Sequence, residues 1–236
     1  MSIETLVQQA DLSSTAFNKE NFDEVVMSTY GRFPIALEKG LGCRLWDTEG
    51  KEYLDFVAGI ATCTLGHAHP KIIEAVTQQI QKIQHVSNLY YIPEQGELAR
   101  WIVDNSCADK VFFCNSGAEA NEAAIKLARK YAHTVLDIDN PIVLTANASF
   151  HGRTLATITA TGQPKYQKNF NPLVPGFNYV PYNDIDAVEA AIGELDEGNY
   201  AVGAIMLEPL QGEGGIRPGD VKYFQKLRSI CDETGI

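Results

Sequence analysis

The chain has 236 residues, of which 45% are hydrophobic and 21% are charged, so it can bury one large α/β core and a smaller appendage. Its formal net charge of -11 argues against a nucleic-acid partner, because binding a phosphate backbone needs a basic face. We recognise no signal or transit peptide and no apolar stretch long enough to cross a bilayer, so we expect no membrane partner.

The five cysteines are odd in number and widely spaced, and none belongs to a C-x-x-C pair. This usage predicts neither a disulfide framework nor a zinc knuckle. A reducing cytoplasm is the compartment that fits it best.

The N-terminal quarter of the chain begins with a polar leader over residues 1–20 and a short helix over residues 21–28. Between residues 35 and 57, short runs with strand composition alternate with Gly-containing turns. This pattern predicts a small antiparallel meander.

A break at Gly66–Pro70 precedes a helical pattern over residues 71–86. Its predicted apolar face consists of Ile72, Ile73, Val76, Ile80 and Ile83. His67 and His69 lie in the break without a nearby carboxylate or cysteine cluster, so we predict a turn-and-cap role for them and no metal site.

The rest of the chain alternates between strand and helix patterns, which predicts a largely parallel sheet with helices on both faces. Strands are predicted at residues 111–114, 142–146, 179–181 and 202–207, and helices at 118–131, 185–192 and 221–234, with a mixed segment at 153–161. Gly235 fits the position after a helix, and Ile236 the start of another strand. We therefore expect a chain truncated within a βα repeat.

The segment Asn115–Glu122 follows the apolar run 110–114 and opens a helix. A Ser/Gly turn at a helix N-terminus presents unpaired N–H groups to an anion, so the turn of Ser116 and Gly117 predicts an anion site that suits a phosphate. The alternative is that Ser116 is an ordinary N-cap. On this helix we expect a buried stripe of Ala120, Ala124, Leu127 and Tyr131, with Glu122, Lys126 and Lys130 outward.

Two other segments follow predicted strands, at residues 149–154 and 208–215, and in a parallel sheet they should converge with the Ser/Gly turn. A planar heterocycle could stack on the ring of Phe150, and the guanidinium of Arg153 could form two parallel hydrogen bonds with a carboxylate. Taken singly, Phe150 could belong to the core and Arg153 to the surface at a helix start. Glu208 could position a substrate amine or pair with an arginine, and its Gly-rich loop could equally be a plain connection.

Five motifs occur together in this chain: Trp46-Asp47-x-x-Gly50-Lys51-x-Tyr53-Leu54-Asp55, Leu65-Gly66-His67-Ala68-His69-Pro70, Phe113-Cys114-Asn115-Ser116-Gly117-Ala118-Glu119-Ala120-Asn121-Glu122, Phe150-His151-Gly152-Arg153-Thr154 and Glu208-Pro209-x-Gln211-Gly212-Glu213-Gly214. Together they resemble the class III pyridoxal-phosphate-dependent aminotransferases from about Phe22 to Ile236. Within that family, residues 85–95 most resemble the members that act on acetylornithine. Ornithine and 4-aminobutyrate aminotransferases are the nearer alternatives.

The resemblance implies a type I aminotransferase fold: an α/β large domain with a mostly parallel sheet flanked by helices, and an N-terminal part of a small α+β domain. We assign residues 21–75 to the small domain and residues 76–236 to an incomplete large, cofactor-binding domain. A homodimer is also implied.

The resemblance also implies roles for individual residues. Ser116, Gly117 and Ala118 would hold the phosphate of pyridoxal 5'-phosphate, and Phe150 would stack on its ring. Arg153 would bind a substrate carboxylate, and Tyr30 and Glu208 would line the substrate pocket. The implied reaction moves an amino group from N2-acetylornithine to the 2-oxo acid 2-oxoglutarate, in arginine biosynthesis.

The family's Schiff-base lysine and its Asp-Glu-Val-Gln segment belong downstream of Ile236, so we predict no catalytic residue within this chain and no turnover by it alone. A non-catalytic or split half that binds phosphate compounds stays an alternative. A doubly wound nucleotide-binding module would explain the phosphate turn, but it predicts a Gly-x-Gly-x-x-Gly turn that is missing near Ser116.

Overall fold

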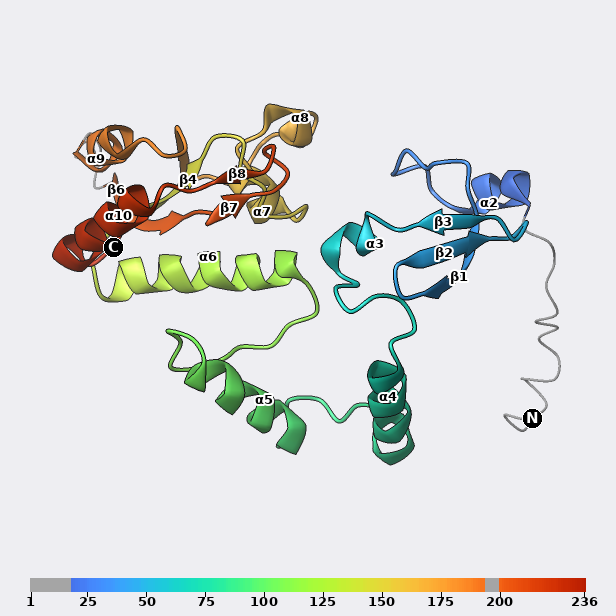
Figure 1. Cartoon of the computed structure of the whole chain (residues 1–236). Coiled ribbons are helices and arrows are strands. Elements are labelled where there is room, and N and C mark those ends of the chain that lie inside the picture. Colours follow the sequence, from blue (N-terminus) through green and yellow to red (C-terminus); the bar gives the residue numbers. More distant parts are fainter. Residues whose placement is uncertain (1–17, 194–199) are drawn as a thin grey trace. The chain divides into compact units, whose positions relative to one another are not determined.

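The computed structural model describes residues 18–193 and 200–236, which form two compact units. The first unit ends at Gly96 and the second runs from Glu97 to Ile236 (Figure 1). The predicted polar leader lies almost wholly outside the described residues, and the predicted domain boundary between residues 75 and 76 stays a prediction.

The first unit contains α2 (Lys19–Val25) and an antiparallel sheet of β1 (Leu37–Leu41), β2 (Arg44–Asp47) and β3 (Glu52–Leu54), in that order. The predicted meander is therefore confirmed. Asp47 fixes its second turn, because one carboxylate oxygen accepts from the backbone N–H groups of Glu49 at 3.0 Å and Lys51 at 2.9 Å. The other oxygen accepts from the Tyr53 hydroxyl at 2.7 Å.

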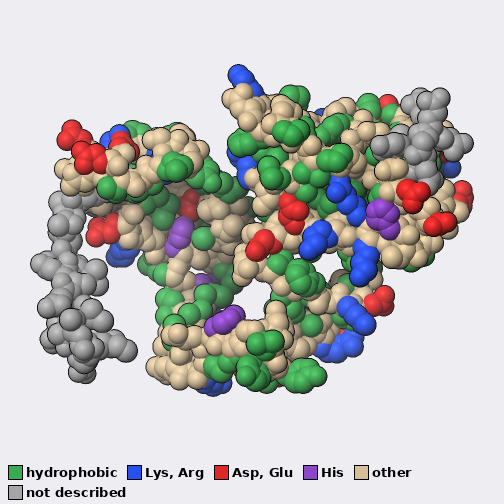
Figure 2. Space-filling view, turned by 180° about the vertical axis from the view of Figure 1, so that it is seen from behind, with side chains coloured by type: hydrophobic (Ala, Val, Ile, Leu, Met, Phe, Trp, Pro, Cys, Tyr) green, Lys and Arg blue, Asp and Glu red, His purple; other side chains and the backbone are tan. Residues whose placement is uncertain are grey.

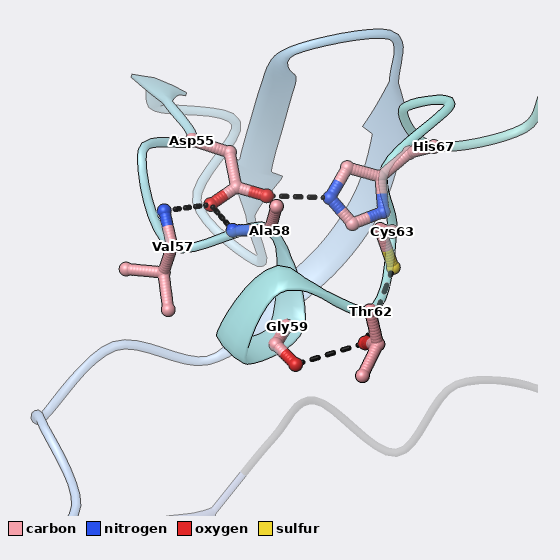
Figure 3. A network of polar contacts seen from close by, with 7 residues as sticks. All are labelled: Asp55, Val57, Ala58, Gly59, Thr62, Cys63 and His67. Atoms are coloured by element: carbon pink, nitrogen blue, oxygen red, sulfur yellow. Dashed lines mark hydrogen bonds and ion pairs between the residues drawn. The ribbon is translucent and has the colours of Figure 1, made fainter. Parts of the chain in front are cut away.

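A left-handed turn, α3 (Ala58–Ala61), follows the meander (Figure 3). All four of its residues have positive φ, between 48° and 62°, which costs about 1–2 kcal/mol for each residue that has a Cβ. One oxygen of Asp55 accepts from the N–H groups of Val57 at 2.9 Å and Ala58 at 2.8 Å, and the other lies 2.7 Å from Nε2 of His67. The bond to His67 holds the pKa of the Asp55 carboxyl below its ordinary value. The ring of His67 therefore supports this turn through Asp55, whereas its backbone forms an isolated antiparallel bridge with Gly42.

The first unit continues into α4 (Pro70–Lys82), which has His69 at its N-cap and Pro70 in its first turn. The predicted helix start is confirmed, but the helix ends four residues before residue 86. Its five predicted apolar side chains are between 48% and 58% exposed, so within the described residues this face is not buried. Figure 2 shows hydrophobic side chains at the surface in both units.

A further helix, α5 (Pro93–Asp104), was not predicted; it contains the boundary between the two units. In the part of the chain that the structure describes, no helix combines the length and the apolar character that crossing a membrane requires.

The second unit contains the parallel sheet, whose strand order is β5-β4-β6. Its elements in chain order are α6 (Gly117–Thr134), β4 (Asn140–Ala146), α7 (Leu155–Ala160), α8 (Pro164–Gln167), β5 (Phe177–Val180), α9 (Ile185–Gly193), β6 (Tyr200–Met206), the short antiparallel pair β7 (Leu210–Gln211) and β8 (Arg217–Pro218), and α10 (Val221–Thr234). The predicted parallel sheet is confirmed, as is the helix over residues 221–234, whose last turn is followed by Gly235 in the left-handed conformation.

Helices cover both faces of this sheet (Figure 1). On one face, Leu144 and Val202 pack with Val188 of α9 and with α10 in the hydrophobic core. The next residue of β6, Gly203, points the other way, because a Cβ placed there would lie 2.8 Å from the Cβ of Ala132 in α6. The predicted three-layer arrangement is therefore confirmed.

The predicted strand at residues 111–114 is wrong, because these residues form no strand and Phe112 is 71% exposed. A strand exists only through pairing with a neighbour, and none of the three strands of the sheet, in the order β5-β4-β6, pairs with these residues. Residues 111–114 have no partner strand within 18–193 and 200–236.

The predicted buried stripe of α6 is also wrong. Ile125 and Ala132 are the buried residues of this helix, whereas Leu127 is 69% and Tyr131 is 42% exposed. Alanines occur around most of α6, so hydrophobic periodicity defines its inner face poorly. Contacts with β4, β6 and α7 select a neighbouring stripe.

Candidate functional site

The residues of the predicted anion site lie at the start of α6. Ser116 is the N-cap, and its Oγ accepts from the N–H of Glu119 at 3.1 Å. The Glu119 carboxylate accepts in turn from the N–H of Asn115 at 2.7 Å, and its hydrogen bonds with Asn115 lower its pKa. Gly117 and Ala118 occupy the first two helical positions, where an N–H has no acceptor within the helix. Two backbone donors therefore point outward from the positive end of an 18-residue helix.

The segment after β4 packs directly on this helix start. A Cβ added to Gly152 would lie 3.0 Å from the Cβ of Ala118. One turn further along α6, Nδ2 of Asn121 donates to the carbonyl of His151 at 2.7 Å. These contacts place the Phe150–Thr154 segment beside the two free N–H groups.

Glu122, which we predicted to point outward, instead holds the far end of the same segment. Its carboxylate accepts from Oγ1 of Thr154 at 2.5 Å and from the N–H of Ala156 at 3.2 Å. The prediction failed because the first turns of α6 face α7 rather than solvent. Lys126 and Lys130 are exposed, as predicted.

Glu208, at the end of β6, joins the third segment to the site. Its Oε2 accepts from the backbone N–H of Phe150 at 3.0 Å, and its carbonyl accepts from the Tyr182 hydroxyl at 2.7 Å. Burial raises the pKa of the Glu208 carboxyl, and the bond from Phe150 acts in the opposite direction. The predicted convergence of the three segments is therefore confirmed, and the carboxylate of Glu208 contacts backbone rather than an arginine.

Phe150 and Arg153 lie together with a third side chain, Tyr166 of α8. The Phe150 and Tyr166 rings meet edge to face, with centroids 5.8 Å apart and planes at 74°. The Arg153 guanidinium carbon lies 5.7 Å from the Phe150 centroid and 4.4 Å from the Tyr166 centroid. Phe150 is half-buried and Arg153 is exposed, so each keeps a surface that a ligand can reach.

The floor of the site is a buried polar network that fixes the loops after β4 and β6. Ser149 is fully buried, and its Oγ accepts from the N–H of Gly162 at 2.9 Å. Gln211 is also fully buried, and its Nε2 donates to the carbonyl of Asn147 at 3.0 Å. These bonds pair backbone groups just beyond the ends of the strands, and they fix the loops that carry Phe150 and Glu208 to the core.

His151 lies within the same network, 5% exposed, and its Nε2 has no hydrogen-bond partner among the described residues. Burial lowers the pKa of His151 to about 4. Its backbone is held on both sides, because its N–H donates to Oγ1 of Thr161 at 2.9 Å and its carbonyl accepts from Asn121. The burial of His151 was not predicted although the residue belongs to a quoted motif, and the position of Tyr166 was not predicted because this residue lies outside the motifs.

Tyr30 belongs to the first unit. It is 73% exposed and lines a cleft of about 740 Å³ together with Phe22 of α2 and Tyr53 of the meander. Within the described ranges, no cluster of three or more His, Cys, Asp or Glu side chains could hold a metal ion.

The sequence of this chain matches the family described as aminotransferase class III over residues 25–236. The chain belongs to this family, and its fold is that of the type I aminotransferases.

Curated relatives named acetylornithine aminotransferase match this chain at high identity. An acetylornithine aminotransferase from Nostoc sp. is 76% identical, with 100% of this chain and 57% of the relative covered. Another from Synechocystis sp. is 72% identical, with 96% of this chain and 53% of the relative covered. The chain therefore spans about half the length of the curated relatives it matches.

Solved structures give the same family. An ornithine aminotransferase from Toxoplasma gondii matches with a TM-score of 0.84 at 31% identity, covering 100% of this chain and 55% of that one. An N-acetylornithine aminotransferase from Stenotrophomonas maltophilia matches with a TM-score of 0.71 at 38% identity, covering 87% of this chain and 50% of that one.

Proposed function

We propose that this chain supplies part of the active site of a pyridoxal-phosphate-dependent acetylornithine aminotransferase. The enzyme would transfer the amino group of N2-acetylornithine to 2-oxoglutarate, in arginine biosynthesis. The observation that carries the proposal is the 76% identity, across the whole chain, to a relative of that name. A second relative of the same name is 72% identical, and these two high identities favour the acetylated donor over ornithine and 4-aminobutyrate.

The start of α6 fits the phosphate of the cofactor. Gly117 and Ala118 present backbone N–H groups there, Ser116 holds the turn, and a Cβ at Gly117 would meet no heavy atom within 4 Å. This space and these donors suit a phosphate group at a helix N-terminus. In our proposal Phe150 stacks on the cofactor ring from the adjacent segment.

When bound, pyridoxal phosphate supplies an electron sink for the carbon that carries the reacting nitrogen. Arg153 binds a carboxylate of the amino acid or of 2-oxoglutarate, because its guanidinium is exposed beside Phe150. Glu208 lines the substrate pocket and holds the backbone of Phe150. Tyr30 is proposed to line the same pocket in the assembled enzyme, which we propose to be a cytoplasmic homodimer.

We also propose that the 236 residues by themselves do not catalyse the reaction. The family's cofactor-linked lysine and its Asp-Glu-Val-Gln segment have no counterpart in them. Lys126 and Lys130 are exposed on α6, and Lys165 contacts the ring of Tyr166, so none of the three is a desolvated amine. Borohydride treatment of the isolated chain with cofactor should add no covalent mass, and an added cofactor mass would contradict this proposal.

The donor preference is tested on the native protein by measuring glutamate formed from 2-oxoglutarate. N2-Acetylornithine should give a higher kcat/KM than ornithine or 4-aminobutyrate. A preference for either of the other two donors would overturn the assignment of substrate, and no glutamate from any donor would overturn the assignment of function.

The phosphate site is tested by two variants at one position. Gly117→Pro removes one N–H, and proline is tolerated at the first position of a helix when the preceding residue is extended, as Ser116 is. Losing one hydrogen bond to a charged group costs about 1.5–3 kcal/mol, so the cofactor Kd should rise roughly tenfold or more. The control Gly117→Ala also adds a Cβ but keeps the N–H, so its Kd should rise less than that of Gly117→Pro; equal Kd values for the two variants would refute the site.

A further inference from the structure

We propose that Tyr166 is a positioning residue for substrate carboxylates: its ring fixes the guanidinium of Arg153 in the orientation in which it receives them. This inference rests on the proposed function. It adds a residue outside the motifs that define the family resemblance, and it assigns a task to α8.

The first argument is the geometry of the three side chains. Arg153 lies 4.4 Å from the Tyr166 centroid and 5.7 Å from that of Phe150, so Tyr166 makes the closer contact. The two rings stand almost perpendicular and form an aromatic corner. A guanidinium over an aromatic face is attracted by the ring quadrupole, and this attraction leaves its N–H groups unused.

The second argument is what Arg153 lacks. Among the described residues its guanidinium makes no hydrogen bond and no ion pair with a carboxylate, although it is exposed. An arginine on a flexible stem would ordinarily sample many rotamers in solvent. Here the aromatic corner restricts the side chain while its donors stay free for an anion.

The third argument is that α8 is itself held firmly. Gln163, at its N-cap, donates to the carbonyl of Ser149 at 2.9 Å. Gln167, its last residue, donates to the carbonyls of Thr161 at 2.9 Å and Thr159 at 3.2 Å. Tyr166 therefore stands on a short helix that is anchored at both ends to the network beneath Phe150.

Lys165 provides the competing explanation, because its ammonium lies 4.6 Å from the same ring. If the ring served Lys165 instead, removing that charge would weaken carboxylate binding. The proposal assigns the binding to Arg153, so Lys165→Met should leave it unchanged.

The test uses the native holoenzyme with glutarate as a dicarboxylate probe, measured by isothermal titration calorimetry, together with kcat and KM for 2-oxoglutarate. Tyr166→Leu should raise the glutarate Kd and the KM by about threefold to tenfold, the range expected for loss of one cation–π contact, with kcat changed less than about twofold. Tyr166→Phe retains the ring and should restore wild-type values. The cofactor absorbance and Tm of Tyr166→Leu should match those of the wild type.

Several results would overturn the proposal. An unchanged Kd in Tyr166→Leu would show that the ring does not position Arg153, and an equal loss in Tyr166→Phe would assign the effect to the hydroxyl, which lies 3.5 Å from Oε2 of Glu213. A loss in Lys165→Met would move the role to the lysine, and lost cofactor binding in Tyr166→Leu would make the residue merely structural. A wild-type protein that forms no glutamate would instead refute the proposed function.

Discussion

Lowering the pH from 7 to 5 should destabilise the second unit through His151. Burial lowers the pKa of this residue to about 4 in the folded chain, against about 6.5 in an unfolded one. Because the folded pKa is the lower of the two, the neutral ring contributes stability above pH 6.5, and this stability is lost as the pH falls towards 4. Between pH 7 and 5 the histidine takes up most of a proton in the unfolded chain and almost none in the folded chain. This difference lowers the free energy of unfolding by about 2 kcal/mol.

Urea unfolding at the two pH values, followed by far-UV circular dichroism, measures this loss. Other groups also titrate, so the quantity of interest is the difference between the wild type and His151→Leu, which fills similar space without a titrating ring. The variant should lose about 2 kcal/mol less than the wild type. His133→Gln, at an exposed position in the last turn of α6, is the matched control for the loss of one histidine side chain. Equal pH dependence in His151→Leu and the wild type would refute the claim that burial keeps the His151 ring neutral in the folded chain.

Three further outcomes are expected. Gly152→Ala should lower the free energy of unfolding by about 2–4 kcal/mol, because φ is +136° and the new Cβ would lie 3.0 Å from that of Ala118. The control Gly212→Ala, whose Cβ would enter open space, should leave the free energy of unfolding unchanged in the same denaturation assay, and equal stability of the two variants would contradict this. Asp55→Asn should lose less stability than the wild type when the pH falls to 4 and below. The folded pKa of Asp55 is lowered, so the stability that its carboxylate contributes is lost as the carboxylate takes up a proton. If the variant and the wild type lost stability equally on acidification, the pair of Asp55 with His67 would not be the source of this pH dependence. Arg153→Ala should raise the KM for 2-oxoglutarate at least tenfold and spare the cofactor Kd, since a charge-assisted pair is lost, and equal losses of both would reject its assignment to the substrate.

The sequence predicts best those features that local chemistry determines. The helix over residues 221–234 agrees with α10 at both ends, because Asp220 caps its start and Gly235 adopts the left-handed conformation at its end. The meander is predicted for the same reason, since Asp47 and Gly50 form its turn whatever lies nearby. The start of α6 also depends on local hydrogen bonds, between Ser116 and Glu119.

The parallel sheet and the convergence of the three segments were predicted, but several other features that depend on distant parts of the chain were not. Residues 111–114 have the composition of a strand, but composition does not supply a partner strand. The inward face of α6 depends on α7 and the sheet, and the Glu122 carboxylate accepts a hydrogen bond from the N–H of Ala156 instead of pointing into solvent. Tyr166 reaches Arg153 only because Gln163 and Gln167 attach α8 to the core.

The segment from Phe150 to Thr154 is attached at both ends by carboxylates from two different elements: Glu208 after β6 and Glu122 in α6. Fixing the backbone of a free loop residue costs about 1–2 kcal/mol, and here that entropy is lost during folding rather than on ligand binding. A cofactor or substrate that reaches Phe150 and Arg153 therefore meets a surface that is already ordered. Replacing the carboxylate of Glu122, which lies outside the proposed pocket, would lower affinity without removing a ligand contact, and the deficit would appear in calorimetry as a less favourable entropy of binding.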